Sequence, residues 1–269
     1  MGNAKTRQVR LVHFSDIHCG SQYFVANLLE RTLVEVNDLA PDAVIITGDL
    51  TNMGYRQEFR EAREYLDRLD CPNIMVSPGN HDSRNVGYMH FERLFGERDR
   101  ALYLDGVTLV GVDSSEPDLD YGRIGRHRYP WIKERFDEGG EDTLRVFALH
   151  HHLLPVPSTG RERNVVHDAG DVLEVLLENR VKLVLSGHKH VPHVWRLEDM
   201  FVVNTGTVST LRLRGDTKPC YNVVDVAGEK VTITRYYPFR GGEVIVEFDA
   251  AATTYTRHDG HIDRVVTDA

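Results

Sequence analysis

Side chains that can bind metal ions follow directly after five strand-like segments of this 269-residue chain. The five groups are Asp16-Ile17-His18, Gly48-Asp49, Gly79-Asn80-His81-Asp82, His150-His151-His152 and Gly187-His188-Lys189-His190. Carboxylate, imidazole and amide oxygen ligands suit manganese, iron, zinc, nickel and cobalt, and a closed structural zinc site would normally include cysteine. The set contains no cysteine, so its residue types favour a catalytic metal site.

The segments that precede these groups are predicted strands of an α/β fold. The predicted strands are Val9–Ser15, Ala43–Thr47, Ile74–Ser77, Val107–Val112, Leu144–Leu149 and Leu183–Ser186. Apolar residues recur every three or four positions in the predicted helices Phe24–Leu39, Gln57–Leu69, Arg84–Phe95, Tyr129–Phe136 and Ala169–Asn179. Ligands bind at the carboxyl ends of strands in such sheets, so we expect the five groups to meet in one crevice. Gly48, Gly79 and Gly187 permit tight turns and a close backbone approach there.

The last third of the chain has a different pattern, which predicts an antiparallel β meander. Short β-type runs occur at Val191–Leu197, Phe201–Asn204, Tyr221–Val226, Lys230–Tyr237, Glu243–Phe248, Tyr255–His258 and His261–Val266. Turn residues such as Asp259-Gly260 separate neighbouring runs. With no Pro, Gly or Ser-rich linker, we expect a single domain over residues 1–269, with a core at about 9–210 and a β-rich extension at about 211–269.

Composition and charge exclude several classes of protein. The chain has 41% hydrophobic residues, 27% charged residues and a formal net charge of −9, which excludes disordered, collagenous and membrane-spanning classes. The negative charge also disfavours a nucleic-acid polymer as partner. The first residues lack an export signal, and three scattered cysteines fit a reducing compartment, so we expect a cytoplasmic protein.

In this order, the five groups resemble the motifs of the calcineurin-like metallophosphoesterases, over residues from about 9 to 210. Four stretches, Thr47–Leu50, Pro78–Asp82, Ala148–His151 and Asn204–Thr207, further resemble bacterial class III cyclic-nucleotide phosphodiesterases and their glycerophosphodiesterase relatives. The resemblance implies a four-layer αββα sandwich, here followed by the C-terminal β meander. It also implies hydrolysis of a phosphoester at two divalent metal ions.

The resemblance assigns a metal-binding role to seven residues. Asp16, His18 and His190 would hold one ion, Asn80, His150 and His188 the other, and Asp49 would bridge both. The family's fourth motif is usually His-His-Pro or His-x-Pro with its first histidine as ligand, whereas here the proline comes later, at Pro155. Two ions, of manganese, iron, zinc, nickel or cobalt, would activate a bridging hydroxide for in-line attack.

Other residues are candidates for acid catalysis and substrate binding. His81 follows the expected ligand Asn80, so its imidazole would protonate the leaving oxygen or stabilise charge, and Asp82 would orient it. The alternative is that Asp82 begins a helix as its N-cap. Asn80 and His81 would contact the phosphoryl group, and Arg161 and Arg163 would bind the non-reacting part of the substrate, unless their loop is only a solvated connector.

Several alternatives stay open at this point. The favoured substrate is a small phosphodiester, with 3′,5′-cyclic nucleotides first; the others are a glycerophosphodiester or phospholipid, a phosphomonoester and a nucleic acid. A catalytically inactive binding scaffold is the alternative that is not an enzyme, and a homodimer through the meander is a candidate assembly. His13 is expected to be a buried, hydrogen-bonded core residue and Cys19 a small apolar filler. His151 and His152 stay ambiguous between packing and support of the ligands.

Overall fold

The computed structural model describes residues 8–159, 165–251, 255–259 and 262–266, with side chains described up to residue 251. Its helices are α1 (Ala26–Leu39), α2 (Arg56–Leu66), α3 (Gly87–Phe95), α4 (Tyr129–Glu138) and α5 (Ala169–Glu178), with a short 3₁₀ turn at Arg126–Arg128. The strands are β1 (Gln8–Phe14), β2 (Ala43–Thr47), β3 (Ile74–Ser77), β4 (Arg100–Leu104), β5 (Val107–Gly111), β6 (Leu144–Ala148), β7 (Leu183–Ser186), β8 (His193–Leu197), β9 (Met200–Asn204), β10 (Tyr221–Ala227), β11 (Lys230–Tyr237), β12 (Gly241–Asp249), β13 (Tyr255–Asp259) and β14 (Ile262–Val266).

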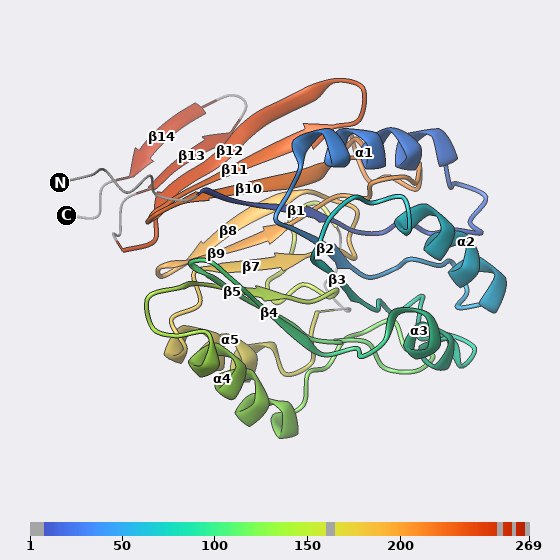
Figure 1. Cartoon of the computed structure of the whole chain (residues 1–269), viewed down its shortest axis with the longest axis horizontal. Helices are drawn as coiled ribbons and strands as arrows, with labels where there is room; N and C mark the ends of the chain where they lie inside the picture. The colour runs from blue at the N-terminus through green and yellow to red at the C-terminus, as the bar shows by residue number, and fades with distance from the viewer. Residues whose placement is uncertain (1–7, 160–164, 252–254, 260–261, 267–269) are drawn as a thin grey trace.

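Two sheets lie between two layers of helices (Figure 1). The first sheet has the strand order β14-β13-β12-β11-β10-β1-β2-β3, and the second has the order β4-β5-β6-β7-β9-β8. Strands β1, β2 and β3 run parallel, as do β5, β6, β7 and β9. The carboxyl ends of both parallel sets carry the five polar groups.

The cores between these layers confirm the four-layer αββα architecture. Because side chains alternate along a strand, Leu11 of β1 lies in the core between the two sheets and Val12 in the core under the helices. The inter-sheet core joins both sheets, for example through Ile45 and Val146. Helices α1, α2 and α3 cover the first sheet, and Phe136 of α4 packs against the second.

The C-terminal meander completes the first sheet. Gln8–His13 of β1 pair antiparallel with Asn222–Ala227 of β10, and β11 and β12 continue outward. Val224 and Ile233 reach the inter-sheet core. The expected hairpin near residues 255–266 is formed by β13 and β14.

Several elements differ from the sequence predictions, and three of these differences have a local explanation. Strand β4 was not predicted; Asp105 and the left-handed Gly106 (φ 79°) are the turn signal that could have identified its hairpin with β5. Helix α3 begins at Gly87, three residues later than expected, because Asn85 and Val86 have positive φ angles. Helix α1 begins at Ala26, because Val25 has an extended backbone (φ −121°, ψ 96°), and the N–H of Val25 donates to the carbonyl of Ser209. Among the described helices, none combines the length and the apolar character needed to cross a membrane.

Candidate metal centre

The loops after β1, β2, β3, β6 and β7 bring the five polar groups together, as the sequence predicted. Backbone bonds extend the strand pairing into these loops. The N–H of Asp16 donates to Gly48 O at 3.0 Å, that of His18 to Asp49 O at 2.9 Å, and that of Gly187 to His150 O at 3.0 Å. The last bond fixes the position of the loop after β7 against the group that follows β6.

The backbone of this site is strained in a way that turns side chains inward. Five non-glycine residues have φ angles between 52° and 73°: Asp16, His18, Asp49, His188 and His190. Such conformations are sparsely populated, cost on the order of 1–3 kcal/mol each and cluster at functional sites. The loop after β7 also packs closely against Asp16. A Cβ on Gly187 would lie 2.5 Å from a carboxylate oxygen of Asp16.

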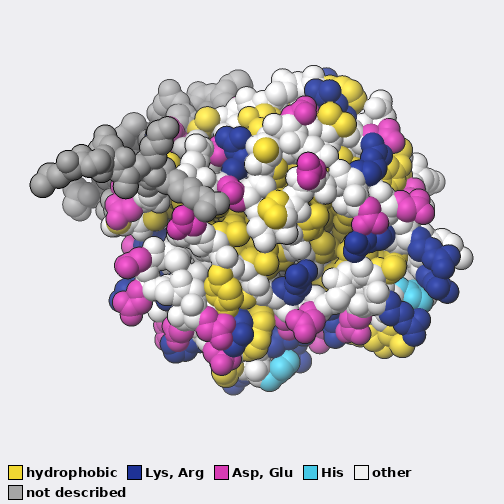
Figure 2. Space-filling model, viewed as in Figure 1, with side chains coloured by type: hydrophobic (Ala, Val, Ile, Leu, Met, Phe, Trp, Pro, Cys, Tyr) yellow, Lys and Arg dark blue, Asp and Glu magenta, His cyan; other side chains and the backbone are white. Residues whose placement is uncertain are grey.

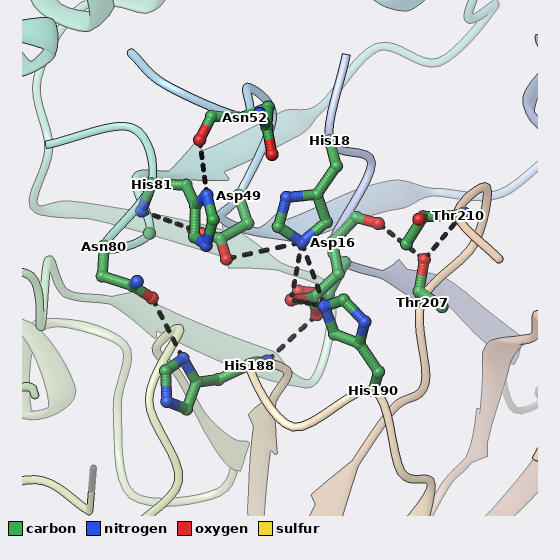
Figure 3. A network of polar contacts seen from close by, with 12 residues as sticks. Asp16, His18, Asp49, Asn52, Asn80, His81, His188, His190, Thr207 and Thr210 are labelled. Carbon is green, nitrogen blue, oxygen red and sulfur yellow. Dashed lines mark hydrogen bonds and ion pairs between the residues drawn. The ribbon is translucent and has the colours of Figure 1, made fainter. Parts of the chain in front are cut away.

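One half of the centre contains Asp16, His18 and His190 (Figure 3). The Nε2 atoms of His18 and His190 are 3.0 Å apart, and Nε2 of His190 is 3.2 Å from Oδ1 of Asp16. This Oδ1 is buried and has no hydrogen-bond partner in the structure. Two imidazole nitrogens and a buried carboxylate oxygen therefore face one another, which fits a bound divalent cation.

The other half contains Asn80, His150 and His188. Oδ1 of Asn80 is 3.0 Å from Nδ1 of His188 and 3.2 Å from Nε2 of His150. Asp49 lies between the two halves, with Oδ2 at 3.3 Å from Nε2 of His150 and 3.6 Å from Nε2 of His18. Its position fits a carboxylate shared by two ions.

Three of the remaining polar atoms of these residues are held by the protein, which orients the inward-facing atoms. Nδ1 of His150 donates to Thr47 O at 2.7 Å, and Nδ1 of His190 donates to Arg212 O at 2.7 Å. Oδ2 of Asp16 accepts from the N–H of His188 at 3.0 Å. Such outer contacts fix the tautomer and ring orientation of metal-binding histidines.

Opposing charges shift the pKa values of these groups. Burial lowers the pKa of His150, but Asp49 outweighs burial and raises it to about 9. Burial also lowers the pKa of His190, but Asp16 outweighs burial and raises it. Burial lowers the pKa of His18 to about 3. Burial would raise the pKa of Asp49, yet His150 and His81 hold it well below its usual value. Burial would likewise raise the pKa of Asp16, but His190 keeps it below its usual value. The centre therefore holds two anionic carboxylates.

His81 lies against the centre, but Asp82 does not orient it. Nδ1 of His81 donates to Asn52 O at 2.5 Å, and its ring contacts that of His18 edge to face at 4.7 Å. The carboxylate of Asp82 instead accepts from the backbone N–H groups of Gly79, Leu50 and Thr51, at 2.9 to 3.1 Å. Burial and Asp49 raise its pKa to about 7. The expectation for Asp82 is thus corrected: it fixes the loop, and the Asn52 carbonyl fixes the imidazole.

A cavity of about 290 Å³ opens over the centre and has a basic rim. The cations lining it are Arg84, Lys189, Arg212 and Arg214. Arg84 donates to Asp120 at 2.6 Å, and Asp120 also accepts from the Asn80 amide at 3.3 Å. Sequence analysis overlooked Arg84 and Asp120, because α3 was expected to begin at Arg84. Arg161 and Arg163, the expected substrate-binding residues, lie outside the described residues.

Four further residues that the sequence analysis discussed are buried near the centre or in the core, namely His13, Cys19, His151 and His152. His13 is buried, with Nε2 at 2.9 Å from Oγ1 of Thr47, and Cys19 is buried in the core beneath the helices, so both expectations are confirmed. Nδ1 of His151 lies 2.8 Å from Oγ of Ser114. The ring of His152 stacks on that of His188 at 5.5 Å. Both histidines therefore pack behind the second half of the centre.

Comparisons with known proteins agree with this geometry. The family model described as calcineurin-like phosphoesterase matches residues 9–192. The chain is 26% identical over 197 residues to a probable cyclic nucleotide phosphodiesterase of Rhodococcus erythropolis, covering 67% of this chain and 64% of that protein. It is 27% identical over 198 residues to a glycerophosphodiester phosphodiesterase of Enterobacter lignolyticus, covering 67% and 70%. The match to the Rhodococcus protein thus spans less than two thirds of that protein's length.

Solved structures share the fold. A purple acid phosphatase from yellow lupin superposes with a TM-score of 0.71 at 14% identity, over 91% of this chain and 53% of that chain. A dimetal phosphatase from Danio rerio superposes with a TM-score of 0.67 at 11% identity, over 90% and 99%. At these identities the likeness shows the architecture alone.

Proposed function

The chain belongs to the calcineurin-like phosphoesterase family, and from that premise we propose that this metal-dependent phosphoesterase hydrolyses small phosphodiesters, with 3′,5′-cyclic nucleotides as the favoured class. The reaction would take place at a dinuclear centre on the floor of the basic cavity. Asp16, His18 and His190 would bind one ion, and Asn80, His150 and His188 the other.

The observation that carries this proposal is the position of the Asp49 carboxylate between the two halves. One of its oxygens lies within 3.6 Å of a histidine nitrogen from each half. When bound, two divalent ions would polarise the phosphoryl oxygens and lower the pKa of a coordinated water to near neutrality. The protein's own part is to hold seven ligand side chains in place.

In this proposal, His81 would transfer a proton to the leaving group. Its Nδ1 is committed to the Asn52 carbonyl, so Nε2 is the ring nitrogen that is available to the substrate. A general acid in this position would protonate the oxygen of the departing alcohol. The rim cations Arg84 and Arg212 would attract the anionic diester and orient its free oxygens.

The size and the charge of the molecule favour a small substrate over a polymer. The cavity of about 290 Å³ is near the lower end of the size range of pockets that hold small molecules. On the face seen in Figure 2, the described Lys and Arg side chains are interspersed with Asp and Glu and form no basic stripe. Combined with a net charge of −9, this disfavours a nuclease.

A glycerophosphodiester is the second candidate substrate. The chain matches the probable cyclic nucleotide phosphodiesterase of Rhodococcus and the glycerophosphodiester phosphodiesterase of Enterobacter at nearly the same identity. The test is a hydrolysis panel with the manganese-loaded protein, comparing cyclic nucleotides, glycerophosphodiesters, bis(p-nitrophenyl) phosphate, p-nitrophenyl phosphate and single-stranded DNA. We expect diesters to be cleaved faster than matched monoesters, and chelation to abolish the reaction. Faster monoester turnover would make the protein a phosphatase, and metal binding without turnover of any ester would make it a scaffold.

A further inference from the structure

A second cavity, of about 560 Å³, lies beside the metal cavity. The two cavities share His81, Arg84 and Arg212 as lining residues, so the second one begins where the first one ends. A substrate whose phosphoryl group sits over the metal centre can therefore place its organic part in the second cavity. The residues that line only the second cavity would then contact this organic part and determine which substrates fit.

These residues have the chemistry of a site for a flat heterocycle. Tyr23 offers an aromatic ring that is 45% exposed, Met53 a polarisable thioether, and Gln22 and Asn52 amide groups that both donate and accept hydrogen bonds. A nucleobase has a π-face for the ring and the thioether, and polar edges for the amides. A glycerol group has polar edges alone and would leave the Tyr23 ring without a stacking partner.

The second cavity is tied to the metal centre by backbone bonds. The N–H of Leu211 donates to Tyr23 O at 2.9 Å, and that of Val25 donates to Ser209 O at 2.8 Å. The neighbouring Arg212 carbonyl accepts from His190, and the Asn52 carbonyl accepts from His81. The walls of the cavity are thus connected to a metal-binding residue and to the proposed general acid, which limits the ordering cost of binding.

Arg84 marks the junction of the two cavities. Its guanidinium is held by Asp120 at 2.6 Å, lies 3.2 Å from Nδ1 of His81, and is only 26% exposed. A fixed cation at this point would contact the phosphate end of a nucleotide while the base lies further along the second cavity.

We propose that the second cavity is a nucleobase subsite in which the base stacks on Tyr23 and the amides of Gln22 and Asn52 contact its polar edge. The inference rests on the proposed function, because it identifies the organic part of the substrate as a nucleoside. The residues that line the second cavity favour nucleotides over glycerophosphodiesters as substrates.

The test compares two ligands that differ only in the base. Binding of AMP and of ribose 5-phosphate to the manganese-loaded protein is measured by calorimetry. We expect AMP to bind about 5- to 150-fold more tightly, which is the range for stacking of one base on an aromatic side chain. Tyr23→Ala should remove most of this preference while leaving the affinity for ribose 5-phosphate unchanged.

Tyr103→Ala is the matched control, because Tyr103 is 47% exposed and lies on β4 of the other sheet. Retention of the AMP preference in Tyr103→Ala is expected. Equal affinity of the wild type for both ligands, or an unchanged preference in Tyr23→Ala, would overturn the subsite.

Diester hydrolysis measured in parallel separates the two proposals. If the wild type cleaves diesters but does not distinguish AMP from ribose 5-phosphate, the subsite is wrong and the phosphodiesterase proposal stands. If the AMP preference depends on Tyr23 but no diester is cleaved, the subsite stands and the phosphodiesterase proposal is wrong.

Discussion

At the scale of single residues, the centre depends on which atoms the protein leaves without a partner. Oδ1 of Asp16 is buried with no hydrogen bond, whereas Nδ1 of His150 and Nδ1 of His190 are each committed to a backbone carbonyl. The ring of His190 lies 3.2 Å from this oxygen, and a buried carboxylate oxygen that still lacks a hydrogen bond fits a site built to bind a cation. Substitution of Asp49 or His81 and titration of His150 test the roles of single residues in this centre.

Asp49→Ala should remove metal and activity together. The carboxylate is the contact between the two halves, and without it two divalent ions would repel each other with one negative charge fewer between them. Mass spectrometry under native conditions should show fewer than two ions, and circular dichroism should show that the chain is still folded. A folded variant that retained two ions would rule out the bridging role.

His81→Ala should keep both ions but lower kcat by roughly 10²–10⁴-fold, the usual range for loss of a general acid. The defect should be large for an alkyl ester and small for a nitrophenyl ester, because nitrophenolate leaves without a proton. An equal loss for both esters would assign His81 to charge stabilisation instead.

Metal affinity should rise with pH. The pKa of His150 in the metal-free protein is about 9, so below this pH each ion that binds its imidazole must displace a proton. The affinity of that ion should increase about tenfold per pH unit between pH 7 and 8.5. Calorimetry in buffers of different ionisation enthalpy measures the protons released. An affinity that does not change with pH would contradict the raised pKa.

At the scale of elements, the strands and their carboxyl-terminal groups were predictable, and the precise turns were not. Short apolar runs of β-forming residues, each followed by polar residues, identify β1, β2, β3, β6 and β7. The left-handed backbone at positions such as Asp49 and His188 leaves no mark in the sequence, since these residue types tolerate it only when the surrounding structure imposes it. Arg84 of the rim was equally hidden, because it reaches the site from a turn that resembles a helix.

Gly187→Ala tests the close packing after β7. A Cβ would lie 2.0 Å from Oγ of Ser15 and 2.5 Å from Oδ2 of Asp16, so the loop would have to move away from the first half of the centre. We expect weaker binding of at least one ion and a lower melting temperature. Gly170→Ala is the control, because a Cβ at that position of α5 meets nothing within 4 Å and should be neutral or slightly stabilising. Equal metal affinity in both variants would show that the loop adapts.

At the scale of the whole molecule, the centre joins the two sheets. Asp16, Asp49 and Asn80 come from the first sheet, whereas His150, His188 and His190 come from the second. An ion bound by both groups would link the two sheets across the inter-sheet core. Metal binding would therefore stabilise the packing of the sheets as well as the loops.

Removal of metal should lower the melting temperature. An ion present at 100 times its dissociation constant stabilises the folded state by about 2.7 kcal/mol, which corresponds to a shift of about 5 °C or more for a chain of this size. Thermal denaturation with and without a chelator measures the shift, and Asp49→Ala should show a smaller one. A chelator that leaves the melting temperature of the wild type unchanged would show that metal does not link the sheets.

The pairing of β1 with β10 also affects folding during translation, because the two strands are far apart in the sequence. Translation produces β1 first, but its antiparallel partner begins only at Tyr221. At about 5–20 residues per second, the first strand waits roughly 10–40 s on the ribosome with one edge unpaired. His188 and His190 are made late in the same interval. Until these two residues are made, the nascent chain carries carboxylates and imidazoles that cannot form either half of the centre, so metal loading follows synthesis of residue 190.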